Sequence, residues 1–297
     1  KRNAQVESLA LYAWNASPRK VEKLAVCCSW LSLIFCCSLK LILFCFYMDK
    51  IITLTPQNVE HEHICCAFAD KKCAEGYQSK KQWLMHRLAD GYVFKKLDVR
   101  GKVFIEYVPA ENAWAPVDAP GYMMIHCFWV SGQFKGKGYG KMLYDECEKE
   151  ALTKGMNGIA VVSSAKKQPF LSEKKFFTAQ GFTVADTAEP YFELLYKPLK
   201  TDAPLPQIKS CAKDGICDNK EGLTVYYTDA CPFNAYYVAV LEVIAAEKGY
   251  KIRAIKIETK EQAQNHFVPY VNYGVFKNGK FITQCVLNES FFHKYIK

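Results

Sequence analysis

The chain has 297 residues, of which 50% are hydrophobic and 14% aromatic, and its formal net charge is +9 at pH 7. This length suits two domains that each bury a core. Because the basic residues are not gathered into a concentrated stripe, no nucleic-acid partner is expected. The 14 cysteines have no framework spacing and several are neighbouring doublets, which favours a reducing cytoplasm over a disulfide-rich secreted protein.

Residues 1–47 form a segment that differs from the rest of the chain. Residues 24–47 are apolar almost throughout and long enough to span a bilayer, and basic residues before them favour a cytoplasmic N-terminus. The segment lacks a small-residue cleavage site, so a cleaved signal peptide is not expected. Met48 opens a stretch typical of a first strand. We therefore expect residues 1–47 to be either upstream sequence foreign to the native protein, which is then cytoplasmic, or an anchor in the inner membrane.

The first part of the region 48–200 alternates between strand-like and helix-like patterns, as in an α/β domain. Pro56 suits the first turn of a helix, Ser79 suits the N-cap of another, and Arg100 and Gly101 suit a hairpin turn. The predicted order is strand, helix, helix, strand and strand, at 50–55, 56–68, 80–90, 93–99 and 102–108, followed by a loop at 110–121.

A glycine-rich turn lies at the centre of this region. The run 122–130 is apolar and long enough for a strand, and apolar positions at three- and four-residue spacing up to residue 150 indicate a helix. A strand that enters such a turn and opens a helix forms an anion site, because free N–H groups and the helix dipole point at the ligand. Glycine allows close approach of the backbone to a phosphate. The turn contains Gly132, Gly136, Gly138 and Gly140, with Lys135, Lys137 and Lys141 around them.

The spacing within the turn indicates its ligand. A Walker loop is absent, and the spacing G-x-G-x-G from Gly136 does not fit the dinucleotide pattern G-x-G-x-x-G. The turn instead resembles the acetyl-CoA loop Q/R-x-x-G-x-G/A of GNAT-family N-acetyltransferases, in register 133–138 or 135–140. The resemblance implies acetyl-CoA as the cosubstrate, bound through the backbone of a strand and through the loop. The implied cofactor-binding residues are Phe128, Trp129, Val130, Gln133, Phe134, Lys135, Gly136, Lys137, Gly138, Tyr139 and Gly140.

The remainder of the region 48–200 continues in the same way. Strands are predicted at 158–164, 182–185 and 191–196, with a short helix at 173–180 that a glycine ends. The order β-α-α-β-β-β-α-β-α-β-β resembles that of the GNAT fold. The resemblance implies an α/β domain with a mixed central sheet and flanking helices.

Residues 201–221 contain several breakers and are predicted to be a linker. Residues 222–297 then form a second, small α/β domain. Its predicted elements are a strand at 223–227, a helix that ends near residue 248 and a second strand at 250–257. A hairpin with Asn278 and Gly279 in its turn follows.

This last domain resembles a thioredoxin- or glutaredoxin-like domain. The resemblance implies that Cys231 is the active-site cysteine, with its pKa lowered at a helix N-terminus, and that Pro269 is the cis-proline beside it. Asn234 stands where the second cysteine of C-x-x-C belongs, so a dithiol cycle within the motif is excluded. Acetyltransferase, linker and thioredoxin-like tail together resemble the YoaP-like GNAT proteins of bacteria.

Acetyl transfer needs a base for the ammonium group and an acid for the leaving thiolate. In the GNAT family the acid is often a tyrosine, and the matching residue here is Phe177; the position of the usual glutamate base matches Met124. His126 lies on the same strand face as Met124 and has a suitable unperturbed pKa, and Glu106 is the second candidate base. A structural histidine and a surface glutamate are the alternatives. Ser164 ends the next strand and is expected to polarise or hydrogen-bond the pantetheine arm.

Two functions stay open at this point. The first is an acetyl-CoA-dependent N-acetyltransferase that acts on the amine of a small molecule, with His126, Glu106 and Ser164 as catalytic candidates. The second is a thiol-redox or binding protein that uses Cys231, with the GNAT half as a CoA-binding platform. No metal cofactor is expected, and a membrane is a partner only if residues 24–47 belong to the native protein.

Overall fold

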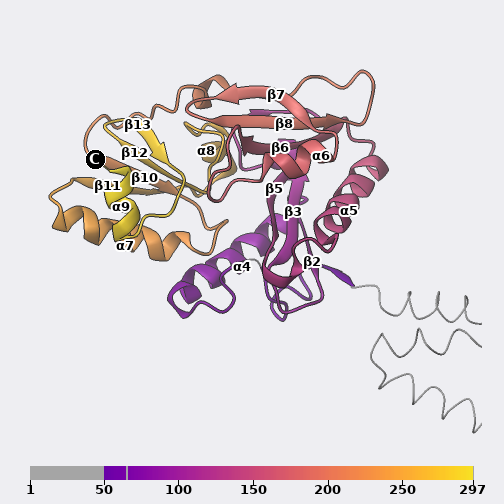
Figure 1. Cartoon of the computed structure of the whole chain (residues 1–297), viewed down its shortest axis with the longest axis horizontal. Coiled ribbons are helices and arrows are strands. Elements are labelled where there is room, and N and C mark those ends of the chain that lie inside the picture. Colours follow the sequence, from indigo (N-terminus) through magenta and orange to yellow (C-terminus); the bar gives the residue numbers. More distant parts are fainter. Residues whose placement is uncertain (1–49, 65, 297) are drawn as a thin grey trace, which may run out of the picture. The chain divides into compact units, whose positions relative to one another are not determined.

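A computed structural model describes residues 50–64 and 66–296 (Figure 1). The expectations for the apolar segment 24–47 fall outside these residues. Within the described part of the chain, no helix is both long enough and apolar enough to cross a bilayer.

A seven-stranded mixed sheet forms the larger part of the structure. Only β5 and β6 are parallel neighbours, and the other adjacent strands of this sheet are antiparallel. In sheet order the strands are β1 (Ile51–Thr53), β2 (Val93–Leu97), β3 (Val103–Pro109), β5 (Tyr122–Val130), β6 (Gly158–Ser164), β8 (Phe192–Pro198) and β7 (Thr183–Ala188).

Helices cover both faces of this sheet. Helix α4 (Ala74–Leu88) packs Trp83 and Leu84 against one face, where β3 contributes Phe104 and Val108. On the other face, α5 (Tyr139–Thr153) and α6 (Lys174–Ala179) pack against the alternate residues of the same strands. The period of two along β3 therefore divides its side chains between two separate cores. Short 3-10 turns lie at η1 (Lys71–Cys73), η2 (Ala110–Asn112) and η3 (Gly132–Phe134).

The predicted helix at 56–68 is wrong. The chain forms turns there, because the Asn58 side chain accepts a hydrogen bond from the Thr55 N–H and donates one to the Thr53 carbonyl. These bonds compete with helix formation. Helix α4 also begins earlier than predicted, because η1, with Asp70 as its N-cap, leads directly into it.

A four-stranded sheet forms the C-terminal part, in the order β11 (Ile252–Lys256), β10 (Leu223–Tyr227), β12 (Tyr273–Lys277) and β13 (Lys280–Thr283). Helices α7 (Asn234–Glu247) and α9 (Glu289–Tyr295) share a core with β10 and β12, and α8 (Lys260–Gln264) follows β11. Asn278 and Gly279 both have positive φ, so the predicted hairpin turn between β12 and β13 is confirmed. In the predicted linker, β9 (Gln207–Ile208) pairs with β4 (Val117–Asp118), and η4 (Ser210–Ala212) follows.

The two sheets are joined by a continuous apolar core, which extends from Trp83 to Phe281. Where α4 meets the C-terminal part, the contact is close enough to require glycine. A Cβ atom on Gly76 would lie 2.3 Å from the carbonyl oxygen of Pro232. The backbone of the loop before α7 therefore rests directly on helix α4.

We predict that Gly76→Ala loosens this contact. Alanine raises helix propensity by about 1 kcal/mol at most, but the added methyl group forces the Pro232 backbone away, and overpacking of this kind costs about 1–3 kcal/mol. Hydrogen exchange in residues 231–237 should become faster, and the unfolding midpoint in urea should fall. Gln78→Ala, at an exposed position of the same helix, is the control. Unchanged exchange in Gly76→Ala would contradict the close contact.

Candidate functional site

Two cavities lie beside strand β5. The first, here called the loop cleft, has a volume of about 760 Å³ and lies between the glycine-rich turn and residues 167–176. The second, here called the inner cavity, has a volume of about 370 Å³ and lies between β5 and the C-terminal part. The two cavities share six lining residues, so they adjoin along one wall. The shared residues are Phe128, Trp129, Pro169, Phe170, Leu171 and Ser172.

The glycine-rich turn has the backbone conformation that its sequence suggests. Gly132, Gly136 and Gly138 have φ values of 59°, 74° and 85°, and a Cβ on any of them would have nothing within 4 Å. Glycine is thus needed for the left-handed backbone and not because a neighbour is close. Gly138 is the N-cap of α5, so the open space lies at a helix N-terminus.

The structure brings nine of the eleven predicted cofactor-binding residues to the loop cleft. Gln133 and Lys137 are exposed and do not line it. Lys141 lines the cleft as well, although its ammonium group pairs with Asp145 at 2.7 Å. The nine residues are Phe128, Trp129, Val130, Phe134, Lys135, Gly136, Gly138, Tyr139 and Gly140.

Strands β5 and β6 separate halfway along their length. Their pairing runs from Tyr122 to Ile125 of β5, whereas β5 continues to Val130 and stays paired with β3 up to that residue. Over residues 126–130 of β5, the backbone edge that faces away from β3 therefore has no strand partner among the described residues. This edge lies beside both cavities and can pair with an extended ligand.

Strand β5 contains a bulge beside the inner cavity. The pairing with β3 passes from Cys127 to Ile125 and leaves His126 out. His126 and Cys127 both line the inner cavity, while Phe128 packs against Phe176 and Phe177 of α6 with ring centroids 4.8 and 5.8 Å apart. A bulge of this kind redirects side chains.

Glu106 of β3 lines the inner cavity and is almost completely buried. Its Oε2 atom accepts a hydrogen bond from Nζ of Lys80 at 2.7 Å, and the two side chains are 1% and 0% exposed. The pKa of Glu106 is raised by burial, against the opposing effect of the Lys80 charge. Glu106 is therefore not a surface glutamate, and a carboxylate with a raised pKa is suited to accept a proton.

His126 is neutral in this environment. Burial, and secondly the charge of Lys80, lower its pKa to about 3, although a hydrogen bond with the Trp114 backbone opposes the shift. Its Nδ1 atom has no hydrogen-bond partner, and its ring lies 5.6 Å from that of Tyr92. The expectation of a pKa suited to a general base is thus not met, and His126 can act only through hydrogen bonds near neutral pH.

The structure does not bring Ser164 to either cavity. Its hydroxyl is buried and donates a hydrogen bond to the carbonyl of Lys166 at 2.8 Å. The hydroxyl proton is therefore already engaged within the protein. Its neighbour Ser163 donates to the carbonyl of Ser172 at 2.7 Å. Ser172 lines both cavities, and this bond holds its backbone in place.

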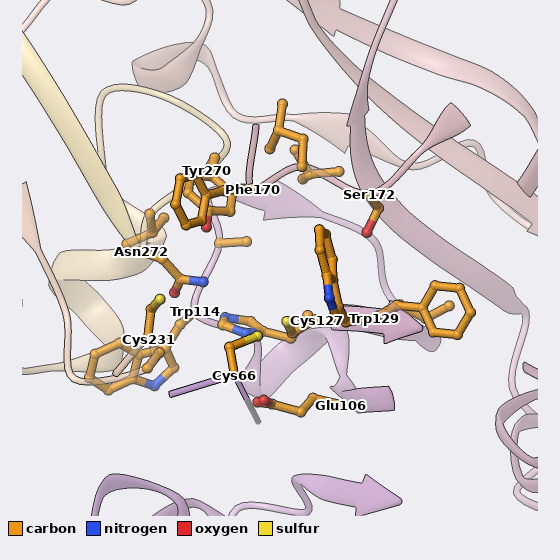
Figure 2. A pocket seen from close by; sticks show the side chains of 18 of the residues that line it. Cys66, Glu106, Trp114, Cys127, Trp129, Phe170, Ser172, Cys231, Tyr270 and Asn272 are labelled. Atoms are coloured by element: carbon orange, nitrogen blue, oxygen red, sulfur yellow. The ribbon is translucent and has the colours of Figure 1, made fainter. Parts of the chain in front are cut away.

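The C-terminal part forms the opposite wall of the inner cavity (Figure 2). Cys231 and Tyr270 lie on this wall, across the cavity from Trp129 and Ser172. Asn234 is buried behind them, and its Nδ2 atom donates to the carbonyls of Thr228 and Asn272 at 2.8 and 2.6 Å. The residue that replaces the second cysteine of the motif thus joins two loops of this wall.

Two expectations for this wall are wrong. Burial raises the pKa of Cys231 to about 11, because desolvation of the thiolate outweighs any stabilisation by the helix N-terminus. Pro269 follows a trans peptide bond, since the cis bond among the described residues is Glu189–Pro190. Cys66 and Cys127 also line the cavity, and burial raises the pKa of Cys66 to about 12 and that of Cys127 well above its ordinary value.

Phe170 lies where the two cavities meet and has an unusual backbone. Its φ is 65°, a left-handed conformation that costs a non-glycine residue about 1–2 kcal/mol. Its ring contacts that of Phe233 at 6.5 Å. The preceding carbonyl, of Pro169, accepts a hydrogen bond at 2.8 Å from the buried Gln284. The C-terminal part therefore holds Phe170 in place.

Several of these residues were missed in the sequence. Cys66, Trp114, Phe170, Ser172 and Tyr270 reach the cavity from separate segments, and no local spacing connects them. The side chains of the described residues contain no cluster of three or more His, Cys, Asp or Glu suited to a metal ion.

Comparisons with known proteins agree with this architecture. Residues 57–182 match the acetyltransferase (GNAT) family and residues 251–294 match the family described as YoaP-like. The class is thus that of the GNAT N-acetyltransferases. Over 244 residues the chain is 41% identical to the uncharacterized N-acetyltransferase YoaP of Bacillus subtilis (strain 168), an alignment that covers 82% of this chain and 96% of that protein. The chain belongs to the YoaP-like N-acetyltransferases of the GNAT family.

Solved structures of GNAT proteins also resemble this chain. The PaiA N-acetyltransferase of Thermoplasma acidophilum in complex with coenzyme A is 18% identical, with 50% of this chain and 99% of that one covered and a TM-score of 0.35. The ribosomal-protein-alanine N-acetyltransferase of Brucella melitensis is 16% identical, with 50% of this chain and 99% of that one covered and a TM-score of 0.36. The predictions of a mixed α/β GNAT fold and of an N-acetyltransferase are confirmed, whereas the thioredoxin-like nature of the C-terminal part stays a prediction.

The raised thiol pKa values predict slow alkylation inside the cavity. At neutral pH, Cys231 should carry roughly a hundredfold less thiolate than an ordinary cysteine and react slowly with iodoacetamide, whereas the exposed Cys211 should react first. Peptide mapping by mass spectrometry gives the rate at each residue, and the urea-unfolded chain, in which all thiols are accessible, is the control. Faster alkylation of Cys231 than of Cys211 would show an activated thiol.

Proposed function

We propose that this N-acetyltransferase transfers the acetyl group of acetyl-CoA to the amine of a small molecule. The observation that carries the proposal is the shared wall of the two cavities: the glycine-rich turn lines one of them and the buried carboxylate of Glu106 lines the other. A cosubstrate in the loop cleft can then extend its thioester past Phe128 and Trp129 into the inner cavity.

The loop cleft fits the pyrophosphate and pantetheine of acetyl-CoA. Backbone N–H groups between Gly136 and Gly140, at the N-terminus of α5, would hold the pyrophosphate, and the exposed Lys135 adds positive charge. The unpaired edge of β5 over residues 126–130 would hydrogen-bond the amides of the pantetheine arm, as a neighbouring strand would. The match of residues 57–182 to the acetyltransferase (GNAT) family supports the same donor.

Glu106 is the proposed general base in the inner cavity. It would take one proton from the ammonium group of the acceptor. The free amine then attacks the thioester carbonyl carbon, so that a C–N bond forms and the C–S bond breaks. The second proton that nitrogen loses passes to the thiolate of CoA, which leaves as the thiol. His126, being neutral, would donate or accept a hydrogen bond beside the reacting atoms.

The C-terminal part is proposed to complete the acceptor site and not to perform redox chemistry. The thiolate is the reactive form of cysteine, and burial raises the pKa of Cys231. Asn234 serves as a hydrogen-bonded support in place of a resolving cysteine. Both observations favour the acceptor-site role over the thiol-redox alternative.

The loop assignment predicts that Gly138→Val abolishes acetyl-CoA binding. Valine strains the backbone at φ 85° and occupies the open space in front of the helix N-terminus. Gly155→Val is the matched control, because Gly155 also has a positive φ of 62° and open space around it but follows the other end of α5, outside the cleft. Calorimetry should give at least about a hundredfold weaker binding for the first variant only. Equal affinities in two folded variants would refute the cofactor site.

The proposed base predicts that Glu106→Gln lowers kcat by about 10²–10⁴-fold without changing the KM for acetyl-CoA. In the unaltered enzyme kcat/KM should rise with pH, because the base acts when deprotonated. The transition should lie above the ordinary carboxylate value of 4.5, since the pKa of Glu106 is raised, and it should vanish in the variant.

A double variant separates catalysis from stability in this test. Glu106→Gln alone leaves the Lys80 charge buried without its partner, which destabilises the fold. Lys80→Met combined with Glu106→Gln removes both charges and should fold, yet stay as inactive as the single variant. Full activity of the double variant would show that the ion pair is only structural.

A further inference from the structure

The inner cavity has a composition that restricts its ligand. Its walls carry large apolar side chains that come from the seven-stranded sheet and from loops of both parts of the chain. Among them are Phe104, Trp114, Met124, Val162, Phe170 and Tyr270. A cavity of about 370 Å³ with such walls favours a compact apolar body and offers little to a ligand covered with hydroxyl groups.

The charged groups around the cavity also restrict which ligands it can bind. Glu106 is the only carboxylate on its wall among the residues that the structure describes, and it is already paired with Lys80. Lys102 also lines the cavity. The thiols of Cys66, Cys127 and Cys231 stay protonated because burial raises the pKa of each. The cavity therefore has no surplus negative charge.

We propose that the acceptor is an apolar monoamine, whose single ammonium group meets Glu106 and whose aromatic or aliphatic body packs between Trp114, Trp129 and Phe170. This inference rests on the proposed function and names its substrate class. A polyamine or an aminoglycoside would bring further ammonium groups into an apolar cavity without a counter-charge, at a cost of several kcal/mol for each. A small polar amine would leave the apolar side chains of the walls without contacts to the ligand.

Phe170 is the specificity-determining residue in this arrangement. It lines both cavities, so its ring lies beside the acceptor where the thioester would enter. Its position depends on the C-terminal part, through Phe233 and through the bond from Gln284 to Pro169. The choice of acceptor would therefore be set jointly by the two parts of the chain.

An amine panel tests the proposal on the full chain. CoA release is measured with phenethylamine, hexylamine, ethanolamine and spermidine at saturating acetyl-CoA. We expect kcat/KM for phenethylamine and hexylamine to exceed that for ethanolamine and spermidine by at least about tenfold. Equal or better turnover of spermidine or ethanolamine would overturn the proposed substrate class while leaving acetyl transfer itself intact.

A variant of Phe170 tests whether the inner cavity determines the preference for apolar amines. Phe170→Gly removes the ring and relieves the positive φ, so the chain should still fold. We expect the KM for phenethylamine to rise by about tenfold or more, with the KM for spermidine unchanged and that for the bulkier naphthylmethylamine lowered. Asn278→Gly relieves a similar φ of 50° in a distant turn and should change none of these values. A Phe170→Gly enzyme with the original preferences would contradict the assignment.

Binding distinguishes a failure of this inference from a failure of the proposed function. If no amine is turned over, phenethylamine and spermidine are titrated against the tryptophan fluorescence of the chain and of Phe170→Gly. Preferential binding of phenethylamine, weakened in the variant, would support an apolar-amine site even without acetyl transfer. Absence of phenethylamine binding would overturn the inference, whether or not acetyl-CoA binds.

Discussion

The end of the pairing between β5 and β6 is the constraint on which the rest of the site depends. Ile125 and Val161 are the last paired residues, and beyond them β5 is bonded only to β3. A sheet that stayed closed would satisfy the backbone of residues 126–130 internally and would leave no edge for an extended ligand. Because the separation occurs beside the N-terminus of α5, the unpaired edge and the glycine-rich turn border the same cleft. His126, which the bulge leaves unpaired with β3, lines the inner cavity beside this edge.

The C-terminal part has the role of a second wall, and its sequence is adapted to docking. Gly76 lets the Pro232 backbone rest on α4, Asn234 joins two loops, and Gln284 fixes the segment that contains Phe170. The apolar core runs through both parts without interruption. Removal of residues 201–297 would therefore expose core as well as open the cavity, and substitutions at the contact are the better way to examine the wall.

Local signals in the sequence predicted most of the fold, together with the glycine-rich turn that opens α5. The glycines of the turn, the apolar run of β5 and the Asn278–Gly279 hairpin each depend on neighbouring residues, and the structure places them as expected. The inner cavity is lined by segments that are far apart in the sequence. No local sequence pattern therefore indicated that Cys66 and Tyr270 would line it. The pKa of Cys231 was predicted in the wrong direction because the sequence shows a helix N-terminus but not the burial that outweighs it. The helix predicted at 56–68 does not form, because the side chain of Asn58 hydrogen-bonds the backbone N–H of Thr55 and the carbonyl of Thr53.

Under the proposed mechanism, Glu106 in its ion pair with Lys80 would take the place of a base at the family's usual position, where Met124 stands. Glu106 lies on the neighbouring strand β3, opposite Cys127, and reaches the same cavity. Burial raises the pKa of Glu106, which would strengthen it as a base, while the charge of Lys80 opposes this shift and its hydrogen bond orients the carboxylate. Once Glu106 held a proton, it would no longer offset the buried charge of Lys80, and the loss of a charge pair in the protein interior is unfavourable by several kcal/mol. Under the proposed mechanism, proton uptake by Glu106 would therefore be short-lived, and the ion pair would favour release of this proton once the acetyl group has been transferred.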